Sequence, residues 1–129
     1  MMVTKITQGI KVSAVSEYVE SSSKPSMFQF VHAYHINIEN LTDKKVQLLS
    51  RHWKIHNSRA VVREVKGEGV IGQQPVLGSM DSFSYSSWSP LTTPVGKMSG
   101  TFTMRYVATG ITFEVEVPEF KLIADFVDN

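Results

Sequence analysis

The sequence predicts an all-β protein in which two antiparallel sheets pack as a sandwich. Hydrophobic and polar residues alternate with a period of two through most of the chain, and short polar turns separate these runs. No segment of roughly ten residues has a convincing helical period. We expect about seven to eight strands. The 129 residues suffice for one domain, 1–129, with its own hydrophobic core.

The N-terminal half contains the longest alternating runs. The first has Ile10, Val12 and Ala14 on one face. A polar stretch at 21–26 is predicted to be a loop. The second run places six residues on one face: Phe28, Phe30, His32, Tyr34, Ile36 and Ile38. After a polar turn at 40–45, the third run has four residues on its inner face: Leu49, Arg51, Trp53 and Ile55.

The C-terminal half continues the pattern with shorter runs. Residues 60–65 form one run, and residues 80–85 form another with Phe83 and Tyr85 on one face. Residues 100–106 and 111–117 are joined by Thr109-Gly110, which favours a tight hairpin. Trp53 at an inward position is typical of an immunoglobulin-like sandwich. The chain has no cysteine for an inter-sheet disulfide, so a fibronectin type III-like variant fits better.

Composition excludes several kinds of partner and site. Thirteen basic and 12 acidic residues give a formal net charge of +1, so we expect neither nucleic acid nor an anionic membrane as a partner. The absence of cysteine excludes thiolate metal sites and thiol nucleophiles, and it is compatible with the cytoplasmic location that we expect. No apolar run approaches the roughly 18 residues of a membrane span.

A glycine-rich motif, G-x-G-x-x-G, lies at Gly67, Gly69 and Gly72. A dinucleotide-binding loop must open into a helix that faces the pyrophosphate. Pro75 and the segment 76–79 do not predict a helix, so we interpret the motif as a loop between strands. The alternative is a weak phosphate or pyrophosphate site formed by the three glycines and Arg51. We expect no bound cofactor.

Four histidines are the candidate metal ligands: His32, His35, His52 and His56. His32 shares the inward face of its strand. His52 and His56 would lie about 13 Å apart along one strand, which is too far to share an ion. A pair such as His35 and His52 would need a suitable register between strands. Because a zinc or cobalt site usually has three or four ligands, we expect no metal site.

Nucleophilic catalysis is not indicated, and we expect the protein not to be an enzyme. The chain contains no G-x-S-x-G sequence. The serines at 82, 84, 86, 87 and 89 alternate with aromatic residues and are predicted to face solvent. Glu114 and Glu116 alternate with apolar residues and are likewise predicted to face solvent.

Four segments resemble the ApaG family: 47–53, 64–77, 90–100 and 113–120. The resemblance extends over about 9–122 and implies a fibronectin III-like sandwich. It also implies genetic links to cobalt and magnesium resistance or efflux and to diadenosine tetraphosphate metabolism. In eukaryotic members the domain acts as a protein-binding module, and the family has no established enzymatic activity. Trp88 departs from the small residues usual there and is expected at a loop edge.

We therefore expect a non-catalytic module that binds a protein partner whose identity is unknown. Its predicted surface combines the Gly67–Pro75 loop with the Pro90–Gly96 loop, with apolar anchors at Val70, Ile71, Trp88 and Leu91. The alternative is that these side chains cap the ends of the sandwich. The competing functions are nucleotide binding and transition-metal binding. A homodimer through an edge strand is also predicted, with the strand containing Ile10 as the candidate edge.

Overall fold

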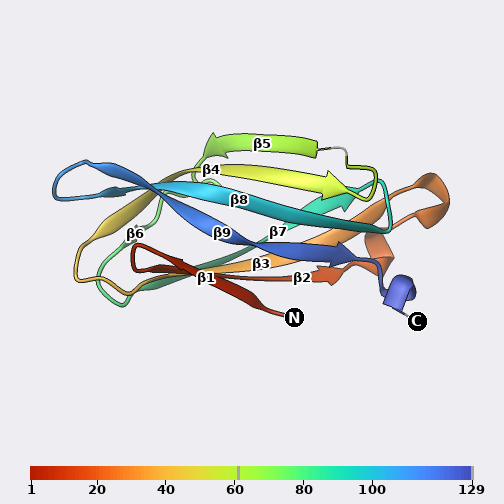
Figure 1. The fold of residues 1–129 in the computed structure, drawn as a ribbon, viewed down its shortest axis with the longest axis horizontal. Coiled ribbons are helices and arrows are strands. Elements are labelled where there is room, and N and C mark those ends of the chain that lie inside the picture. Colours follow the sequence, from red (N-terminus) through yellow and green to blue (C-terminus); the bar gives the residue numbers. More distant parts are fainter. Residues whose placement is uncertain (61, 129) are drawn as a thin grey trace.

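Two antiparallel β-sheets pack face to face in the computed structural model, which describes residues 1–60 and 62–128 (Figure 1). One sheet has the order β1-β2-β3-β7, and the other has the order β5-β4-β8-β9 with β6 beside β4. The strands are β1 (Val3–Thr7), β2 (Ile10–Tyr18), β3 (Phe30–Asn40), β4 (Val46–Asn57), β5 (Val62–Glu68), β6 (Val76–Leu77), β7 (Ser82–Leu91), β8 (Val95–Tyr106) and β9 (Thr112–Ile123). The predicted all-β sandwich is confirmed.

Three short 3-10 helices lie at one end of the sandwich: η1 (Glu20–Ser22), η2 (Pro25–Met27) and η3 (Asp125–Asp128). The first two occupy the predicted β2–β3 loop. Within the described residues, no helix is long and apolar enough to cross a membrane.

An aromatic cluster around Trp53 joins the two sheets. The Trp53 ring lies 5.5 Å from Tyr34 of the facing sheet and 6.0 and 6.1 Å from Phe102 and Phe120 of its own sheet. Gly100 is the cross-strand partner of Trp53, and a Cβ there would lie 3.1 Å from Trp53 Cε3 and 2.4 Å from the His52 carbonyl oxygen. The glycine therefore gives the indole the room it needs between the sheets.

Two irregularities in register keep the apolar side chains pointing inward. In β4 the register shifts between Leu48 and Ser50, so Leu48 is buried and Leu49, predicted on the inner face, is not. In β9 the register shifts opposite Ser99, so Val117 and Phe120 are both buried. Proline suits this bulge at Pro118 because it has no N–H to donate to a neighbouring strand.

Three predicted elements differ in the structure. Phe28 is not a strand residue, since it has φ +57° and β3 begins at Phe30. β7 extends to Leu91, so Trp88 lies in a strand and not at a loop edge. The strand with Ile10 is β2, which lies between β1 and β3, so its prediction as an edge is wrong. The predicted run at 60–65 includes position 61, which is outside the described residues.

One lateral side of the sandwich is closed by contacts between the sheets. Lys5 of β1 forms an ion pair with Glu116 of β9, and the Glu116 amide donates to Thr7 Oγ1 at 3.2 Å. On the opposite side, β5 is the outermost strand of its sheet and lies beyond β7 in Figure 1. Strands β5 and β7 therefore form an open lateral side.

His32 points into the core, as its position in the alternating run predicts. It is fully buried, and its ring centroid lies 5.4 Å from that of Tyr18. Among the described residues neither ring nitrogen has a hydrogen-bond partner. Burial lowers the pKa of His32 to about 4, although the nearby Asp125 carboxylate opposes this shift. His32 is therefore neutral in the folded protein at neutral pH.

We expect folding stability to fall as the pH is lowered from about 6.5 towards about 4. Unfolded His32 binds a proton at its ordinary pKa, whereas the folded protein resists protonation, so acid favours unfolding. The contribution of neutral His32 to the free energy of unfolding is complete above the pKa that histidine has in the unfolded chain. It should decrease by about 3 kcal/mol across this window. Urea unfolding at several pH values gives the free energy of unfolding as a function of pH. This free energy should change less steeply with pH for His32→Leu than for the wild type or for His35→Leu. Equal slopes in all three proteins would contradict this assignment.

Candidate functional site

An open groove lies at the end of the sandwich where the β2–β3, β4–β5 and β7–β8 connections meet, at the right of Figure 1. Its volume is about 520 Å³. We call it the end groove; four segments line it through Phe28, Gln29, Val31, Ile55, Asn57, Arg63, Pro90, Leu91 and Thr92. Most of these side chains are apolar, as in sites that bind organic or protein ligands.

The floor of the end groove belongs to the core. Ile55 of β4 and Leu91 of β7 are 6% and 5% exposed and come from opposite sheets. The adjoining turns are tied together, because the Ser58 amide donates to Thr93 Oγ1 at 3.1 Å and Asn57 Nδ2 donates to Thr92 Oγ1 at 3.3 Å. The groove is therefore formed before any ligand binds.

Phe28 at the rim is held in an unusual conformation. Its φ of +57° is left-handed, which costs a non-glycine residue roughly 1–2 kcal/mol. The Phe28 amide donates to the Pro25 carbonyl at 3.0 Å, and a bridge between Lys24 and Gln29 closes the loop behind it. This geometry leaves the Phe28 ring 69% exposed. Strain that exposes an aromatic side chain points to a functional role.

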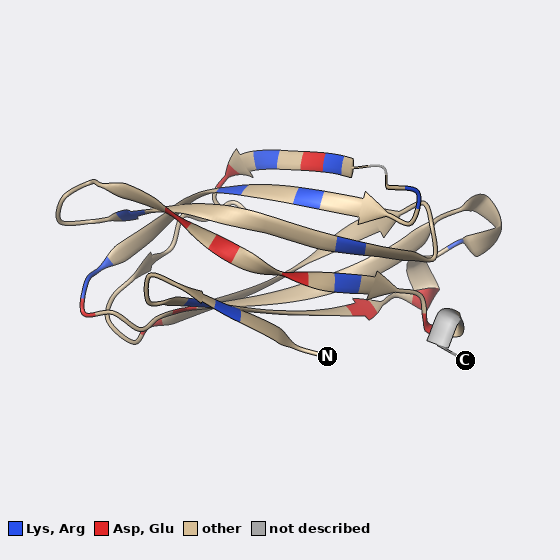
Figure 2. Cartoon of the chain, viewed as in Figure 1, with Lys and Arg blue, Asp and Glu red and all other residues tan. Residues whose placement is uncertain are grey.

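The charged residues around the end groove are basic. Arg63 lines the groove itself, and a second hollow of about 420 Å³ shares Phe28 and Thr92 with it and adds Arg59. No acidic side chain lines either hollow within the described residues, nor does either guanidinium have an ion-pair partner there. Figure 2 marks these basic positions at the start of β5 and in the β4–β5 turn. The groove is therefore apolar with a positive margin.

The two loops of the predicted surface lie at separate places along β4. The glycine loop lies beside Leu49, where the Gly69 amide donates to the Leu49 carbonyl at 2.8 Å, whereas the β7–β8 turn contacts Asn57. These two positions are eight residues apart on β4, or about 26 Å. The two loops therefore do not form one pocket, and a partner would have to span about 26 Å to contact both.

The four predicted apolar anchors divide into two pairs. Val70 is fully buried and Leu91 is 5% exposed. These two side chains therefore follow the alternative prediction, in which they pack against the core at the ends of the sandwich. Ile71 and Trp88 are 52% and 56% exposed. Trp88 lies on the outer face of β7, two residues before Pro90, and therefore flanks the end groove. Trp88 was predicted as an exposed anchor on a loop and is exposed on a strand, whereas alternation placed Phe28 on an inner face because it could not show that the φ of Phe28 depends on its loop.

The glycine loop is not organised to bind an anion. Gly67 lies within β5, and only Gly69 and Gly72 of the three have positive φ. Arg51 Nη1 donates to the Glu68 and Gly69 carbonyls at 3.0 and 2.9 Å. The Gly69 and Val70 amides donate to backbone carbonyls, and the chain continues into β6 instead of a helix. The loop thus presents carbonyl oxygens, and the predicted anion site is not supported.

The candidate metal ligands His35 and His52 lie in different sheets. His35 is on the outer face of β3, and His52 is on the outer face of β4, where its Nε2 lies 3.6 Å from Glu64. They therefore point away from each other on opposite faces of the sandwich. Among the described residues, no three histidine, cysteine, aspartate or glutamate side chains are placed to hold a metal ion.

A row of hydrogen-bonded polar side chains crosses the outer face of β2, β3 and β7, and sequence reasoning missed it. His35 Nδ1 lies 2.5 Å from Ser86 Oγ, and His35 Nε2 lies 3.4 Å from Glu17 Oε1. A serine nucleophile needs a sharp turn and a site that excludes water, whereas Ser86 is in mid-strand and exposed. Of the serines predicted to face solvent, Ser89 is instead buried.

We expect Arg51→Met to destabilise the protein by about 1–3 kcal/mol, because two carbonyl oxygens lose a charged donor. Hydrogen exchange should speed up at the Gly69 and Val70 amides. Lys54→Met, on the exposed face of the same strand, is the control and should change neither quantity. If Arg51 instead held an anion, inorganic phosphate would raise the melting temperature of the wild type but not of Arg51→Met, which would contradict this assignment.

Comparison with known proteins places the chain in one family. The model of the ApaG domain matches residues 20–106. The protein ApaG of Methylobacterium sp. is 47% identical over 116 residues, covering 90% of this chain and 88% of its own. ApaG of Rhodospirillum centenum is 43% identical over 121 residues, covering 94% and 92%.

Solved structures agree with these sequence relatives. The crystal structure of a putative ApaA protein from Bordetella pertussis has a TM-score of 0.86 at 42% identity and covers 90% of this chain and 94% of its own. A second structure, a structural-genomics target, has a TM-score of 0.87 at 30% identity and covers 95% and 92%. The chain therefore belongs to the ApaG domain family.

Proposed function

We propose that the protein is a non-catalytic binding module that holds an extended segment of another protein in the end groove. The single observation that carries this proposal is a preformed apolar groove with the strained, exposed Phe28 at its rim. Aromatic anchors at the edge of a pocket are typical of interaction hot spots. Trp88 and Pro90 extend the apolar surface along β7.

The charge of the groove margin defines the partner. Arg59 and Arg63 have no ion-pair partners among the described residues and flank the apolar floor. A matching segment has an apolar side chain for the floor formed by Ile55 and Leu91, with carboxylates on either side. Such pairing favours acidic segments over basic ones and speeds their association.

In this proposal the links of the family to cobalt and magnesium resistance and to diadenosine tetraphosphate act through the bound partner. The domain itself then holds neither the metal nor the nucleotide. The cysteine-free sequence fits the cytoplasmic location that we also propose.

The proposal predicts that one protein is captured from the native cell by the wild type and lost by groove variants. We expect Phe28→Ser and Arg59→Glu each to reduce capture by about tenfold or more, since each removes a direct contact. The measurement is affinity capture with quantitative mass spectrometry, followed by titration of the purified partner.

Ile111→Ser is the matched control, because Ile111 is 62% exposed in the β8–β9 hairpin at the opposite end of the sandwich. It should retain capture. Phe28 and Arg59 are both exposed, so their variants should keep the wild-type melting temperature. Undiminished capture by both groove variants would refute the proposed surface.

A further inference from the structure

Strand β5 is the free sheet edge best suited to pair with another strand. The β1 and β9 edges lie against each other, joined by the ion pair between Lys5 and Glu116. The β7 edge contains Pro90, which cannot donate a backbone hydrogen bond, and β5 projects past it. In contrast, β5 contains no proline, is hydrogen-bonded to β4 on one side, and lies along the upper margin of Figure 1.

The outer face of β5 is complementary to itself. Its outward side chains include Glu64 and Lys66, which lie on the same face on either side of Val65. A two-fold axis at Val65 and perpendicular to the sheet would place each Glu64 opposite Lys66 of the partner subunit. Opposite charges in directly facing positions stabilise a strand pair, whereas like charges destabilise it.

Charge selects this register over the two adjacent ones, and an axis at Gly67, which also sets Lys66 opposite Glu68, would pair only residues 66–68 of β5. Directly facing side chains of an antiparallel pair lie on the same face of the sheet. With a two-fold axis perpendicular to the sheet, this holds only when the axis passes through a residue and not between two residues. An axis at Glu64 would set that carboxylate against its own copy, and an axis at Lys66 would do the same for the ammonium group. The axis at Val65 instead yields two favourable pairs and no like-charged pair on the outer face.

The inner face accommodates the same register. Val65 is half-buried against the core and would meet its own copy on the axis. Arg63 would lie opposite Gly67 of the partner subunit, over which the partner's Arg51 guanidinium packs. That guanidinium already donates to two carbonyls, and Arg63 extends away from it towards the end groove. Gly69, with φ +61°, turns the chain away after β5, so the following loop leaves the edge accessible.

We propose that the protein forms a two-fold symmetric dimer in which β5 pairs antiparallel with β5 of a second copy, with Val65 on the axis. The pairing joins two sheets into one continuous sheet. A single strand of seven residues buries less area than a standard stable interface, so the dimer is weak and concentration-dependent. This inference does not depend on the end groove.

Cysteine cross-linking tests the register, because the wild type has no cysteine. Facing residues in antiparallel strands have Cα atoms about 4.5–5.5 Å apart, within disulfide range, so oxidised Val65→Cys should form a covalent dimer. In the same register Val62 faces Glu68 of the partner subunit, and the two Val62 positions lie about 20 Å apart. Val62→Cys is therefore the control and should cross-link at least about tenfold more slowly. Equal rates would overturn the proposal.

Charge reversal provides a second test on exposed positions where folding is not at risk. Sedimentation velocity should show a reversible dimer for the wild type. Glu64→Lys or Lys66→Glu alone should weaken it by about tenfold, because each creates two like-charged pairs. The double variant should restore the dimer. A wild type that stays monomeric up to millimolar concentration, or single variants that dimerise as well as the wild type, would overturn the proposal.

Discussion

The contact of Trp53 with both sheets is the constraint on which the rest of the structure depends. Its ring lies against Tyr34 of the facing sheet, and Gly100 leaves space for it on the neighbouring strand. This contact fixes the position of β4 over the first sheet, so β5, paired with β4, extends beyond β7. The open side, the overhanging edge and the end groove all follow from that offset.

Sequence periodicity could predict the strands because side chains in a strand alternate between faces. It placed Trp53 and His32 in the core correctly, and it located the hairpin at Gly110, whose φ is +75°. It failed at Leu49, where an extra residue changes the parity, because a bulge depends on the partner strand. The same limit applies to edges: the pattern around Ile10 describes a strand but not its neighbours.

The candidate site was harder to predict because no single segment contains it. Ile55 and Leu91 meet from opposite sheets, and Arg63 reaches them from a third strand. Alternation shows which face a side chain occupies, but Trp88 was proposed as a surface anchor from its predicted place on a loop, and it lies in a strand. Alternation cannot show that Val70 closes the core after a glycine turn, nor that Phe28 stands exposed. Both outcomes depend on loop geometry that arises only when the sheets pack.

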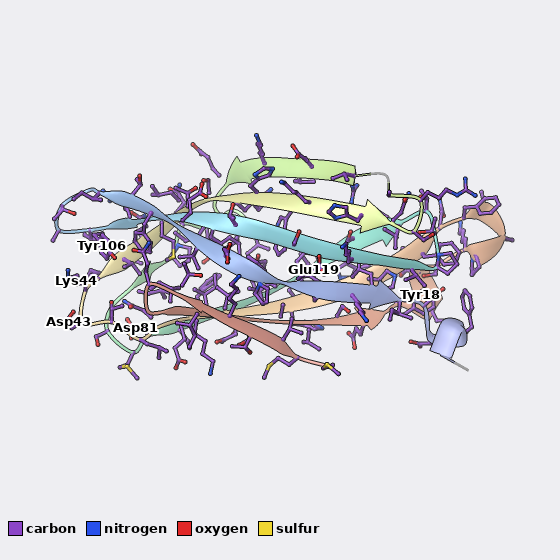
Figure 3. All side chains as sticks on the ribbon, viewed as in Figure 1. Tyr18, Asp43, Lys44, Asp81, Tyr106 and Glu119 are labelled. Atoms are coloured by element: carbon purple, nitrogen blue, oxygen red, sulfur yellow. The ribbon has the colours of Figure 1, made fainter. Side chains whose placement is uncertain are left out.

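The two lateral sides of the sandwich differ in backbone edges and in charge. On the β1 and β9 side, the two edges lie against each other, and the ion pairs join Lys5 to Glu116 and Lys97 to Glu119, which Figure 3 labels. On the other side, β5 has a free backbone edge while Arg63 points from its inner face towards the groove. A strand with both a free edge and an unpaired charge has the properties that favour association with another chain. The physical asymmetry of the fold therefore favours this side for the interactions that we propose.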